Sequence, residues 1–271
     1  RLADKLVFSK VKPLLGFSRT RVAVSGAAAI NKEILEFFSG LDVTIYEVYG
    51  QSEGCGPTTF NRPGATRFGT TGQAWPGSEV KLAPDGEVIM RGPNVFIGYY
   101  KDAAATRDTL IDGWLHSGDL GRFDEEGYLS IVGRKKDIII TSGGKNIAPR
   151  NIEAALKNIE LIGDAVLVGE GRKYLSALLT LEPEAAGRFA AANQIEGAEL
   201  HTHPKVIAAI QAEIDEVVNP QFARVEQVRK FTLLSRPFSV EGGEMTPTLK
   251  LKRKVIYDMH LDAIEDMYTD E

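Results

Sequence analysis

The sequence is poor in the residues that build disulfide frameworks and zinc sites. Its 271 residues contain one cysteine, Cys55, which excludes an internal disulfide, and four histidines without the spacing of zinc ligands. No apolar run approaches the roughly 20 residues that span a bilayer. The formal net charge of −5 argues against general nucleic-acid binding, because that function needs a broad basic face. We expect a cytoplasmic protein.

What is present is the composition of a globular protein, with 43% hydrophobic and 25% charged residues. A chain of 271 residues exceeds the usual size of one domain, so one large or two smaller domains are expected. The sequence begins without methionine or a signal-peptide pattern, and we expect it to be part of a longer chain.

The first part, about residues 1–66, has the order of a parallel α/β piece. The β-branched run RVAVS (residues 21–25) predicts a buried strand, spaced isoleucines and Phe38 predict a helix, and VTIYEVYG from Val43 predicts a second strand. Residues 67–135 change to short apolar stretches between turn residues, which predicts a β-rich subdomain with one helix over 103–111.

Residues 136–271 read as a small α+β domain, with the boundary inside the segment from Arg134 to Asp137. Ile138 to Ile140 predict a short buried strand, and a helix is expected to begin near Pro149. The strands DAVLVG, YLSALLTLEP and VRKFTLL and a helix from Pro204 complete the pattern. The fold class is therefore α/β followed by α+β.

SGAAA, residues 25–29, ends a strand in residues so small that a flat ligand could lie directly on the backbone at Gly26 and Ala27. Small residues also serve close helix packing, and for this motif alone packing is the favoured interpretation.

YGQSEG, residues 49–54, lies where the next strand ends, and ligands characteristically bind at the carboxyl ends of parallel strands. Tyr49 could stack on a base, Ser52 could hydrogen-bond a phosphate, and Glu53 could hold Mg²⁺. A polar turn that contains a core tyrosine is the alternative.

DGWLHSGDLG, residues 112–121, sets Asp119 between glycines in what reads as a polar turn. A carboxylate there could accept both hydroxyls of a ribose, although a turn residue is the commoner role. Cys55 is expected to be a small packing residue and His116 a structural or solvent-facing one, because neither has a visible catalytic partner.

Two further segments carry clustered cations. MTPTLKLKRK, residues 245–254, makes a rigid turn followed by four basic residues, either a solvated face or a loop that delivers one ammonium to a phosphate. GRKKDIIITSGGKNIAP, residues 133–149, sets charges before the isoleucines and two glycines after them.

Taken in order, SGAAA, YGQSEG, GEVIMRGPNVFIGYY, DGWLHSGDLG, GRKKDIIITSGGKNIAP and TPTLKLKRK resemble the adenylate-forming superfamily, which includes acyl-CoA synthetases, luciferases and peptide-synthetase adenylation domains. TPTLKLKRK, in place of the more widespread PxTxxGK, and KLVFSKVKPLLG are similar to long-chain fatty acyl-CoA synthetases in particular. The resemblance covers essentially the whole chain.

The resemblance implies two half-reactions with ATP, Mg²⁺, coenzyme A and a long-chain fatty acid: a carboxylate attacks the α-phosphorus of ATP to give acyl-AMP and pyrophosphate, and the CoA thiol then attacks the acyl carbonyl. It implies that the small domain rotates between these half-reactions about Lys136. By this resemblance, Gly26 and Ala27 would contact adenine and the acyl carbonyl, and Tyr49, beside Gly50, would stack on the base. Ser52 would contact a phosphate, Glu53 would bind Mg²⁺, and Asp119 and Arg134 would bind the ribose. Gly143 would lie along the path of the pantetheine arm, and Lys252 would be the catalytic lysine, with Lys250 as the second candidate.

One departure from the family pattern concerns the glycine-, serine- and threonine-rich phosphate loop, which these 271 residues do not contain. Without its backbone cradle for the β and γ phosphates, we expect the chain alone to be inactive in adenylation. Two alternatives stay open: a ligase that loads acyl-AMP onto a carrier protein, and a nucleotide- or lipid-binding module without catalysis. Peripheral membrane association and oligomeric state are also open.

Overall fold

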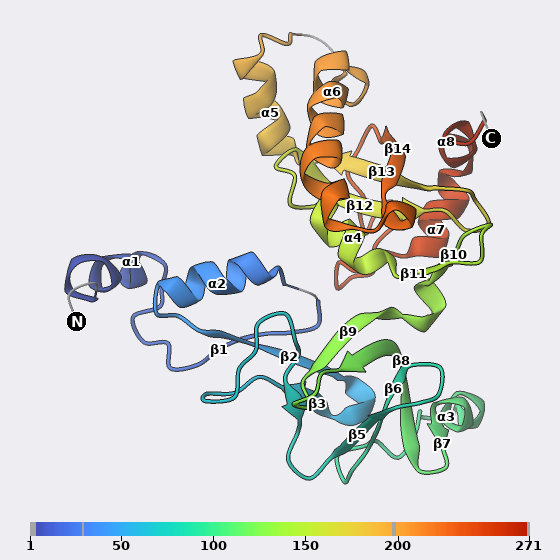
Figure 1. Cartoon of the computed structure of the whole chain (residues 1–271). Helices are drawn as coiled ribbons and strands as arrows, with labels where there is room; N and C mark the ends of the chain where they lie inside the picture. The colour runs from blue at the N-terminus through green and yellow to red at the C-terminus, as the bar shows by residue number, and fades with distance from the viewer. Residues whose placement is uncertain (1–3, 29, 197–198, 270–271) are drawn as a thin grey trace. The chain divides into compact units, whose positions relative to one another are not determined.

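The computed structural model describes residues 4–28, 30–196 and 199–269 (Figure 1). The chain divides into two compact units, Arg1–Lys136 and Asp137–Glu271. Each unit has sheets and helices of its own, and the two are described separately.

The first sheet of unit 1 contains the predicted strand–helix–strand order. Strand β1 pairs in parallel with β2, and helix α2, which connects them, lies along the sheet (Figure 1) and buries Leu35 completely. β2 then pairs antiparallel with β3, and β3 with β4, in the order β1-β2-β3-β4. The elements are η1 (Asp4–Phe8), α1 (Ser9–Leu14), β1 (Ala23–Ser25), α2 (Lys32–Gly40), β2 (Ile45–Gln51), η2 (Ser52–Gly54), β3 (Gly56–Phe60) and β4 (Gln73–Ala74).

A five-stranded antiparallel sheet forms the rest of unit 1, as the β-rich pattern predicted. Its strands follow the order β5-β6-β8-β7, with β9 paired to β8, and Val88, Leu115 and Leu129 are buried in its core. The predicted helix is α3, which is capped by the Asp102 side chain accepting from the Ala105 N–H at 2.9 Å. The elements are β5 (Glu79–Leu82), β6 (Glu87–Arg91), α3 (Ala103–Thr109), β7 (Leu110–Ile111), β8 (Trp114–Phe123) and β9 (Leu129–Arg134).

Unit 2 is built on a three-stranded sheet in the order β12-β13-β14. Because successive side chains of a strand point to opposite faces, the sheet has two cores. Ala165 and Leu167 pack with α4, α5 and α6, whereas Val166 and Val168 pack with α7 and α8 (Figure 1). The elements are α4 (Pro149–Leu156), β12 (Ile162–Val168), β13 (Leu175–Leu181), α5 (Pro183–Ala192), α6 (Pro204–Glu213), β14 (Val228–Leu233), α7 (Arg253–Met259) and α8 (Leu261–Asp266).

The isoleucine run is shorter and less buried as a strand than predicted. A 3₁₀ turn, η3 (Lys135–Asp137), precedes strand β10 (Ile139–Ile140), which pairs antiparallel with β11 (Asn146–Ile147). Ile139 is 3% exposed, but Ile140 is 48% exposed. The prediction of a buried strand from Ile138 to Ile140 was therefore wrong except at Ile139.

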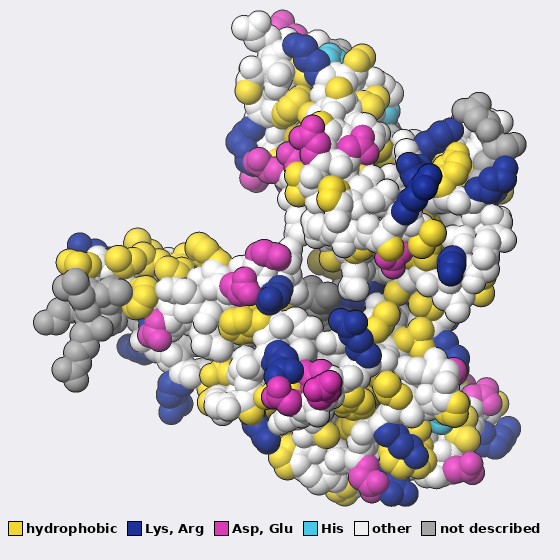
Figure 2. All heavy atoms as spheres, viewed as in Figure 1, with side chains coloured by type: hydrophobic (Ala, Val, Ile, Leu, Met, Phe, Trp, Pro, Cys, Tyr) yellow, Lys and Arg dark blue, Asp and Glu magenta, His cyan; other side chains and the backbone are white. Residues whose placement is uncertain are grey.

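The surface carries both signs of charge. Lys, Arg, Asp and Glu side chains are interspersed on the visible face, and hydrophobic side chains gather over α1 and α2 (Figure 2). Within the described ranges, no helix combines the length and the apolar character that a membrane crossing needs.

Candidate active site

Three residues that the sequence singled out separately meet in unit 1. Asp119 on β8 and Arg134 on β9 are register partners, and the Arg134 Nε donates to Asp119 Oδ1 at 3.2 Å. The Tyr49 hydroxyl, at the end of β2, donates to Asp119 Oδ2 at 2.8 Å. Both oxygens of one carboxylate are therefore fixed by side chains from two different strands.

Burial helps to set the protonation state of Tyr49 in this cluster. Burial and the neighbouring Asp119 carboxylate raise the pKa of Tyr49 far above its ordinary value, so the phenol stays protonated and donates. Asp119 is 7% exposed, whereas half of the Arg134 side chain is exposed. A carboxylate has about four lone-pair sites, and the two donors leave it capacity for two more, such as a pair of hydroxyls.

Asp119 lies within strand β8 and not in the predicted polar turn. The interpretation of the residues after Leu115 as a polar turn was wrong, because β8 runs from Trp114 to Phe123 and only bulges at Ser117–Asp119. Gly118 takes φ +73° there, a conformation that favours glycine. The glycines that suggested a turn mark the bulge instead.

Glu87 on β6 supports this bulge, and the sequence analysis missed it. Its carboxylate accepts from the Gly118 N–H at 2.8 Å and from Lys135 Nζ at 3.3 Å, and it lies 3.1 Å from His116 Nδ1. Burial opposes its ionisation, but the contacts with His116, Gly118 and Lys135 outweigh burial and hold the pKa of Glu87 below its ordinary value. His116 is thus a structural partner, as expected. Glu87 belongs to the motif GEVIMRGPNVFIGYY, but the motif alone does not indicate its contact with residue 118.

Glu53 belongs to the 3₁₀ turn η2 that follows β2. Its Oε1 accepts the Tyr99 hydroxyl at 2.7 Å, and its backbone carbonyl accepts from the Phe96 N–H at 2.7 Å. Tyr99 is a contact that sequence reasoning missed, because 46 residues separate the pair. Ser52 opens the same turn and is exposed.

Cys55 departs from its expected role as a packing residue. It is exposed and takes φ +51°, the left-handed conformation that ends η2. The position is set by the tight return from β2 to β3, and not by a need to fill the core.

The glycines of the two strand ends are required by backbone packing. A Cβ at Gly26 would lie 2.7 Å from Val48 Cγ1, and one at Gly50 would lie 2.0 Å from the Gly56 carbonyl oxygen. Close packing therefore explains Gly26, but the neighbour is Val48 of strand β2 and not a helix, as the packing interpretation of SGAAA had it. Ala27 is exposed with φ +67°, and Ala29, the last residue of the motif, lies outside the described residues.

Glu53 can hold a cation only in company with other ligands. In the described part of the chain, no group of three or more His, Cys, Asp or Glu side chains could hold a metal ion by itself. Mg²⁺ is ordinarily bound by one or two carboxylates together with substrate phosphates and water. One carboxylate that keeps a free oxygen beside its bond to Tyr99 fits that mode.

Both candidate lysines lie in unit 2, on the loop before α7. The Lys250 N–H donates to Thr246 Oγ1 at 3.0 Å, and the Lys252 N–H donates to the Glu244 carbonyl at 2.7 Å. Both lysines are exposed. Leu249 takes φ +59°, the left-handed conformation that favours glycine.

Two ion pairs, each with at least one buried or partly buried partner, anchor the loop on either side. Glu244, 1% exposed, accepts from Arg236 at 2.7 and 2.8 Å. Arg253 donates to Glu153 Oε2 on α4 at 2.9 Å. Burial opposes the charge of Arg253, but Glu153 overcomes that penalty and raises its pKa. In the sequence, Arg253 is one of the four basic residues of MTPTLKLKRK, and Arg236 was not singled out.

The remaining predicted residues lie in connecting segments. Lys136 lies in η3 and is the last residue of unit 1. Gly143 lies in the exposed turn between β10 and β11, where an added Cβ would meet only Thr141 Oγ1 at 4.0 Å. Packing does not require glycine at this position.

Two family models match the chain. Residues 2–100 match the AMP-binding enzyme model, and residues 136–271 match the model of the AMP-binding enzyme C-terminal domain.

Curated relatives match over almost the whole chain. It is 40% identical over 272 residues to the long-chain-fatty-acid–CoA ligase FadD15 of Mycobacterium bovis, covering 99% of this chain and 45% of the relative. It is 39% identical over 298 residues to the long-chain-fatty-acid–CoA ligase ACSBG2 of Xenopus laevis, covering 99% of this chain and 40% of the relative. The chain thus spans less than half the length of these two relatives.

Solved structures share the fold. The adenylation domain of a carboxylate reductase from Mycobacterium chelonae aligns with a TM-score of 0.75 at 23% identity, over 99% of this chain and 42% of that one. An o-succinylbenzoate coenzyme A synthetase from Bacillus subtilis in complex with ATP and magnesium aligns with a TM-score of 0.65 at 22% identity, over 90% and 49%. The predicted fold class, α/β followed by α+β, is confirmed by these structures, each of which the chain matches over less than half of its length.

Proposed function

Since the chain belongs to the AMP-binding enzyme family, we propose that it is the C-terminal part of an ATP-dependent long-chain fatty acid:CoA ligase. The reaction joins a fatty acid to AMP with release of pyrophosphate and then transfers the acyl group to the thiol of coenzyme A. The named relatives that share about 40% identity with it support a long-chain acid as the substrate class.

The observation that carries this proposal is the Tyr49–Asp119–Arg134 cluster. A buried carboxylate with both oxygens oriented and lone pairs left over is suited to hold the two hydroxyls of a ribose. The half-exposed Arg134 pairs with the carboxylate and leaves a cation beside it that can reach the same ligand. Pre-orientation lowers the entropy cost of binding.

ATP and Mg²⁺ are the proposed partners of the neighbouring turn. Ser52 would contact a phosphate, and Glu53 would hold Mg²⁺ together with phosphate oxygens. When bound, Mg²⁺ would neutralise charge on the phosphates, which is the main requirement of phosphoryl chemistry. Tyr99 holds the Glu53 carboxylate in place through its hydroxyl.

For the catalytic lysine, the backbone favours Lys250 over Lys252. In the widespread PxTxxGK form, glycine directly precedes the lysine, and here Leu249 has the left-handed φ that glycine adopts readily. Counted from Thr246 instead of Thr248, the TxxGK spacing also ends at Lys250. We therefore assign the lysine that bridges acyl carboxylate and α-phosphate to Lys250, with Lys252 as the alternative.

Coenzyme A is the proposed acyl acceptor. The open turn at Gly143 would let the pantetheine arm lie against the backbone, and the 3₁₀ turn at Lys136 would be the hinge of the small domain. A hinge between two compact units needs few residues to absorb a large change of backbone angles.

We further propose that these 271 residues do not make acyl-AMP on their own. They cover 45% of FadD15 and contain no glycine-, serine- and threonine-rich phosphate loop. The β and γ phosphates would then lack their backbone donors.

The test compares the chain alone with a chimera in which the N-terminal part of the Mycobacterium bovis ligase precedes it. With palmitate, ATP, Mg²⁺ and coenzyme A, we expect pyrophosphate release and palmitoyl-CoA from the chimera and neither from the chain alone. Robust pyrophosphate release by the chain alone would overturn the proposed inactivity.

A second arm offers free coenzyme A and an acyl carrier protein to the same chimera. Acylation of coenzyme A is expected. If the folded chimera acylates only the carrier protein, the acceptor is a carrier protein and not coenzyme A. If the chimera binds AMP but activates no fatty acid, the ligase assignment is contradicted.

A further inference from the structure

The buried carboxylate of Glu87 contacts residues on both sides of the Asp119–Arg134 pair. It accepts from the backbone N–H of Gly118, which directly precedes Asp119, at 2.8 Å. It also accepts at 3.3 Å from Nζ of Lys135, which directly follows Arg134. Glu87 is 5% exposed, whereas about half of the Lys135 side chain is exposed, so the carboxylate is the buried partner of the lysine contact.

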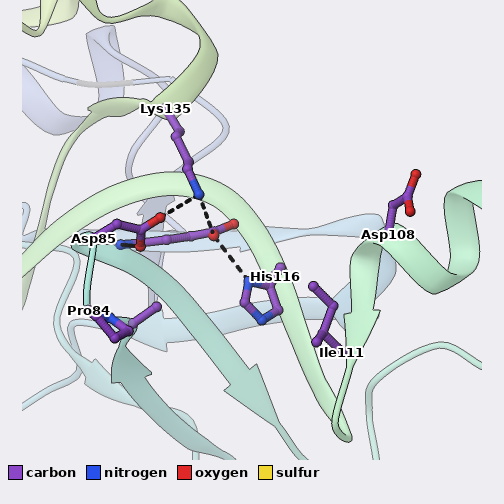
Figure 3. Close-up of a pocket in the computed structure, with 8 residues that line it drawn as sticks. Pro84, Asp85, Asp108, Ile111, His116 and Lys135 are labelled. Atoms are coloured by element: carbon purple, nitrogen blue, oxygen red, sulfur yellow. Dashed lines mark hydrogen bonds and ion pairs between the residues drawn. The ribbon is translucent and has the colours of Figure 1, made fainter.

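Lys135 links Glu87 to the loop before β6. Its ammonium extends toward Asp85 (Figure 3), and Nζ lies 2.5 Å from Asp85 Oδ2. His116 lies beside it in the same pocket of about 510 Å³ (Figure 3), with Nδ1 3.1 Å from the second oxygen of Glu87. The Glu87 N–H in turn donates to Asp85 Oδ1 at 3.1 Å.

The strand geometry explains why Asp119 needs this support. Glu87 of β6 pairs with Leu120 of β8, and Ile89 pairs with His116. The segment of β8 between these two pairs is longer than the segment of β6, so β8 carries extra residues that have no ladder partner. The N–H groups of such residues must find other acceptors when they are buried. Glu87 Oε1 is the acceptor for Gly118, and a hydroxyl, Ser117 Oγ, accepts from the Asp119 N–H at 3.0 Å.

A purely structural role for Glu87 is the competing explanation, because a buried carboxylate always needs donors. Hydrophobic residues could stabilise β6 at lower desolvation cost, since burying a charge is expensive even when it is paired. A carboxylate is required only where N–H and ammonium donors converge. Here those donors belong to the residue before Asp119 and the residue after Arg134.

We propose that Glu87 is a positioning residue for the nucleotide site: it fixes the bulge that aims Asp119 and the strand end that carries Arg134. This inference rests on the proposed function, because it takes the Asp119–Arg134 pair as the ribose site. In this proposal Glu87 does not contact the nucleotide and acts through Gly118 and Lys135.

Three variants separate the two contacts. Glu87→Gln keeps an amide oxygen for the Gly118 N–H but places an NH₂ group, which cannot accept, near Lys135. Lys135→Met also keeps the Gly118 contact and removes the ammonium. Glu87→Ala removes both contacts. Glu79→Ala is the matched control, because Glu79 forms an exposed pair with Arg91 on the adjacent strand.

The measurement is an NMR titration of the 271-residue chain with AMP, at a temperature where circular dichroism shows every variant folded. We expect Glu87→Ala to weaken AMP binding by about 10-fold or more, the usual effect of losing a residue that orients a binding group. Glu87→Gln and Lys135→Met should each weaken it by a few-fold, and Glu79→Ala should leave it unchanged.

Hydrogen exchange without nucleotide gives a second readout. The amides of residues 118–120 should exchange faster in Glu87→Ala but not in Glu87→Gln. If Glu87→Ala fails to fold, unchanged AMP affinity in both Glu87→Gln and Lys135→Met would overturn the proposal.

The inference and the proposed function fail in different ways. If Asp119→Ala abolishes AMP binding while Glu87→Ala binds like Glu79→Ala, the nucleotide site stands and the positioning role of Glu87 is wrong. If AMP does not bind the wild-type chain, or binds Asp119→Ala equally well, the nucleotide site itself is wrong and the inference falls with it.

Discussion

The Tyr49–Asp119–Arg134 cluster of unit 1 and the loop of unit 2 that carries Lys250 and Lys252 are held in different ways. At the cluster, the functional side chains themselves are fixed, because Tyr49 and Arg134 occupy both oxygens of a buried Asp119. At the loop, hydrogen bonds fix the backbone at Lys250 and Lys252, while both side chains are exposed.

The difference matches what each region has to do. A carboxylate that recognises a rigid sugar gains from being oriented in advance, since little entropy is lost on binding. A lysine acts as a mobile point charge, and ordering its side chain costs up to about 2 kcal/mol of rotamer entropy. The contacts that fix the loop are therefore those of its backbone and of the ion pairs beside it, and not those of the two lysine side chains.

The largest expected effect comes from breaking one of those anchors. Glu153→Ala leaves the buried Arg253 without its partner, which should lower the free energy of unfolding of unit 2 by about 3–5 kcal/mol. Urea denaturation followed by circular dichroism measures it. Lys254→Ala is the control, because its exposed pair with Asp258 should contribute under about 0.5 kcal/mol. Equal destabilisation by the two variants would contradict the anchoring role.

The next effect separates function from stability. In the chimera, Lys250→Ala should reduce acyl-AMP formation by about 10²–10³-fold, as expected when one charge-stabilising group is removed. The transfer of supplied acyl-AMP to coenzyme A should persist, and urea stability should not change, because the side chain is exposed.

Lys252→Ala is the matched variant and should cost adenylation much less. If Lys252→Ala shows the large loss and Lys250→Ala does not, the assignment reverts to Lys252. Equal loss of both half-reactions in either variant would contradict the rotation of the small domain.

A smaller effect is expected where the side chains are fixed. Tyr49→Phe removes one hydrogen bond to a buried carboxylate and keeps Arg134, so the free energy of unfolding of unit 1 should fall by about 1.5–3 kcal/mol. Urea denaturation, monitored by NMR signals of unit 1, measures the change. Stability equal to wild type would mean that Asp119 does not depend on Tyr49.

The pH dependence tests the second anchor. Burial opposes the ionisation of Glu244, but Arg236 and the Ser239 N–H outweigh it and hold the pKa of Glu244 below its ordinary value of 4.5. Because the folded-state pKa is the lower one, this stabilisation is present above about pH 4.5 and is lost as the pH falls through the folded value. Glu244→Gln should flatten the stability profile of unit 2 in that range. An unchanged slope would contradict the pairing.

Much of the fold followed from local patterns, for identifiable reasons. Alternating and continuous apolar runs predicted β12, β13 and β14, and a proline at the first turn predicted the start of α4. Helices α7 and α8 were missed because they are short, and because in each of them a single side chain, Ile256 or Ile264, is buried.

The residues of the cluster were singled out one by one, but their arrangement was not predicted. The motifs singled out Tyr49, Asp119 and Arg134, yet hydrogen bonds across 70 and 15 residues create the cluster. Glu87 lies in the motif GEVIMRGPNVFIGYY, but it was not singled out, because its contacts depend on a bulge in a neighbouring strand. Contacts of this kind depend on register, which periodicity does not encode.

The most direct test of the central claim is the titration of AMP into the 271-residue chain and its Asp119→Ala variant, followed by amide chemical shifts. The account predicts that wild-type signals near Tyr49, Asp119 and Arg134 move in a saturable manner and that Asp119→Ala abolishes the response. Saturable binding that is indifferent to Asp119, or shifts confined to residues away from this cluster, would contradict it.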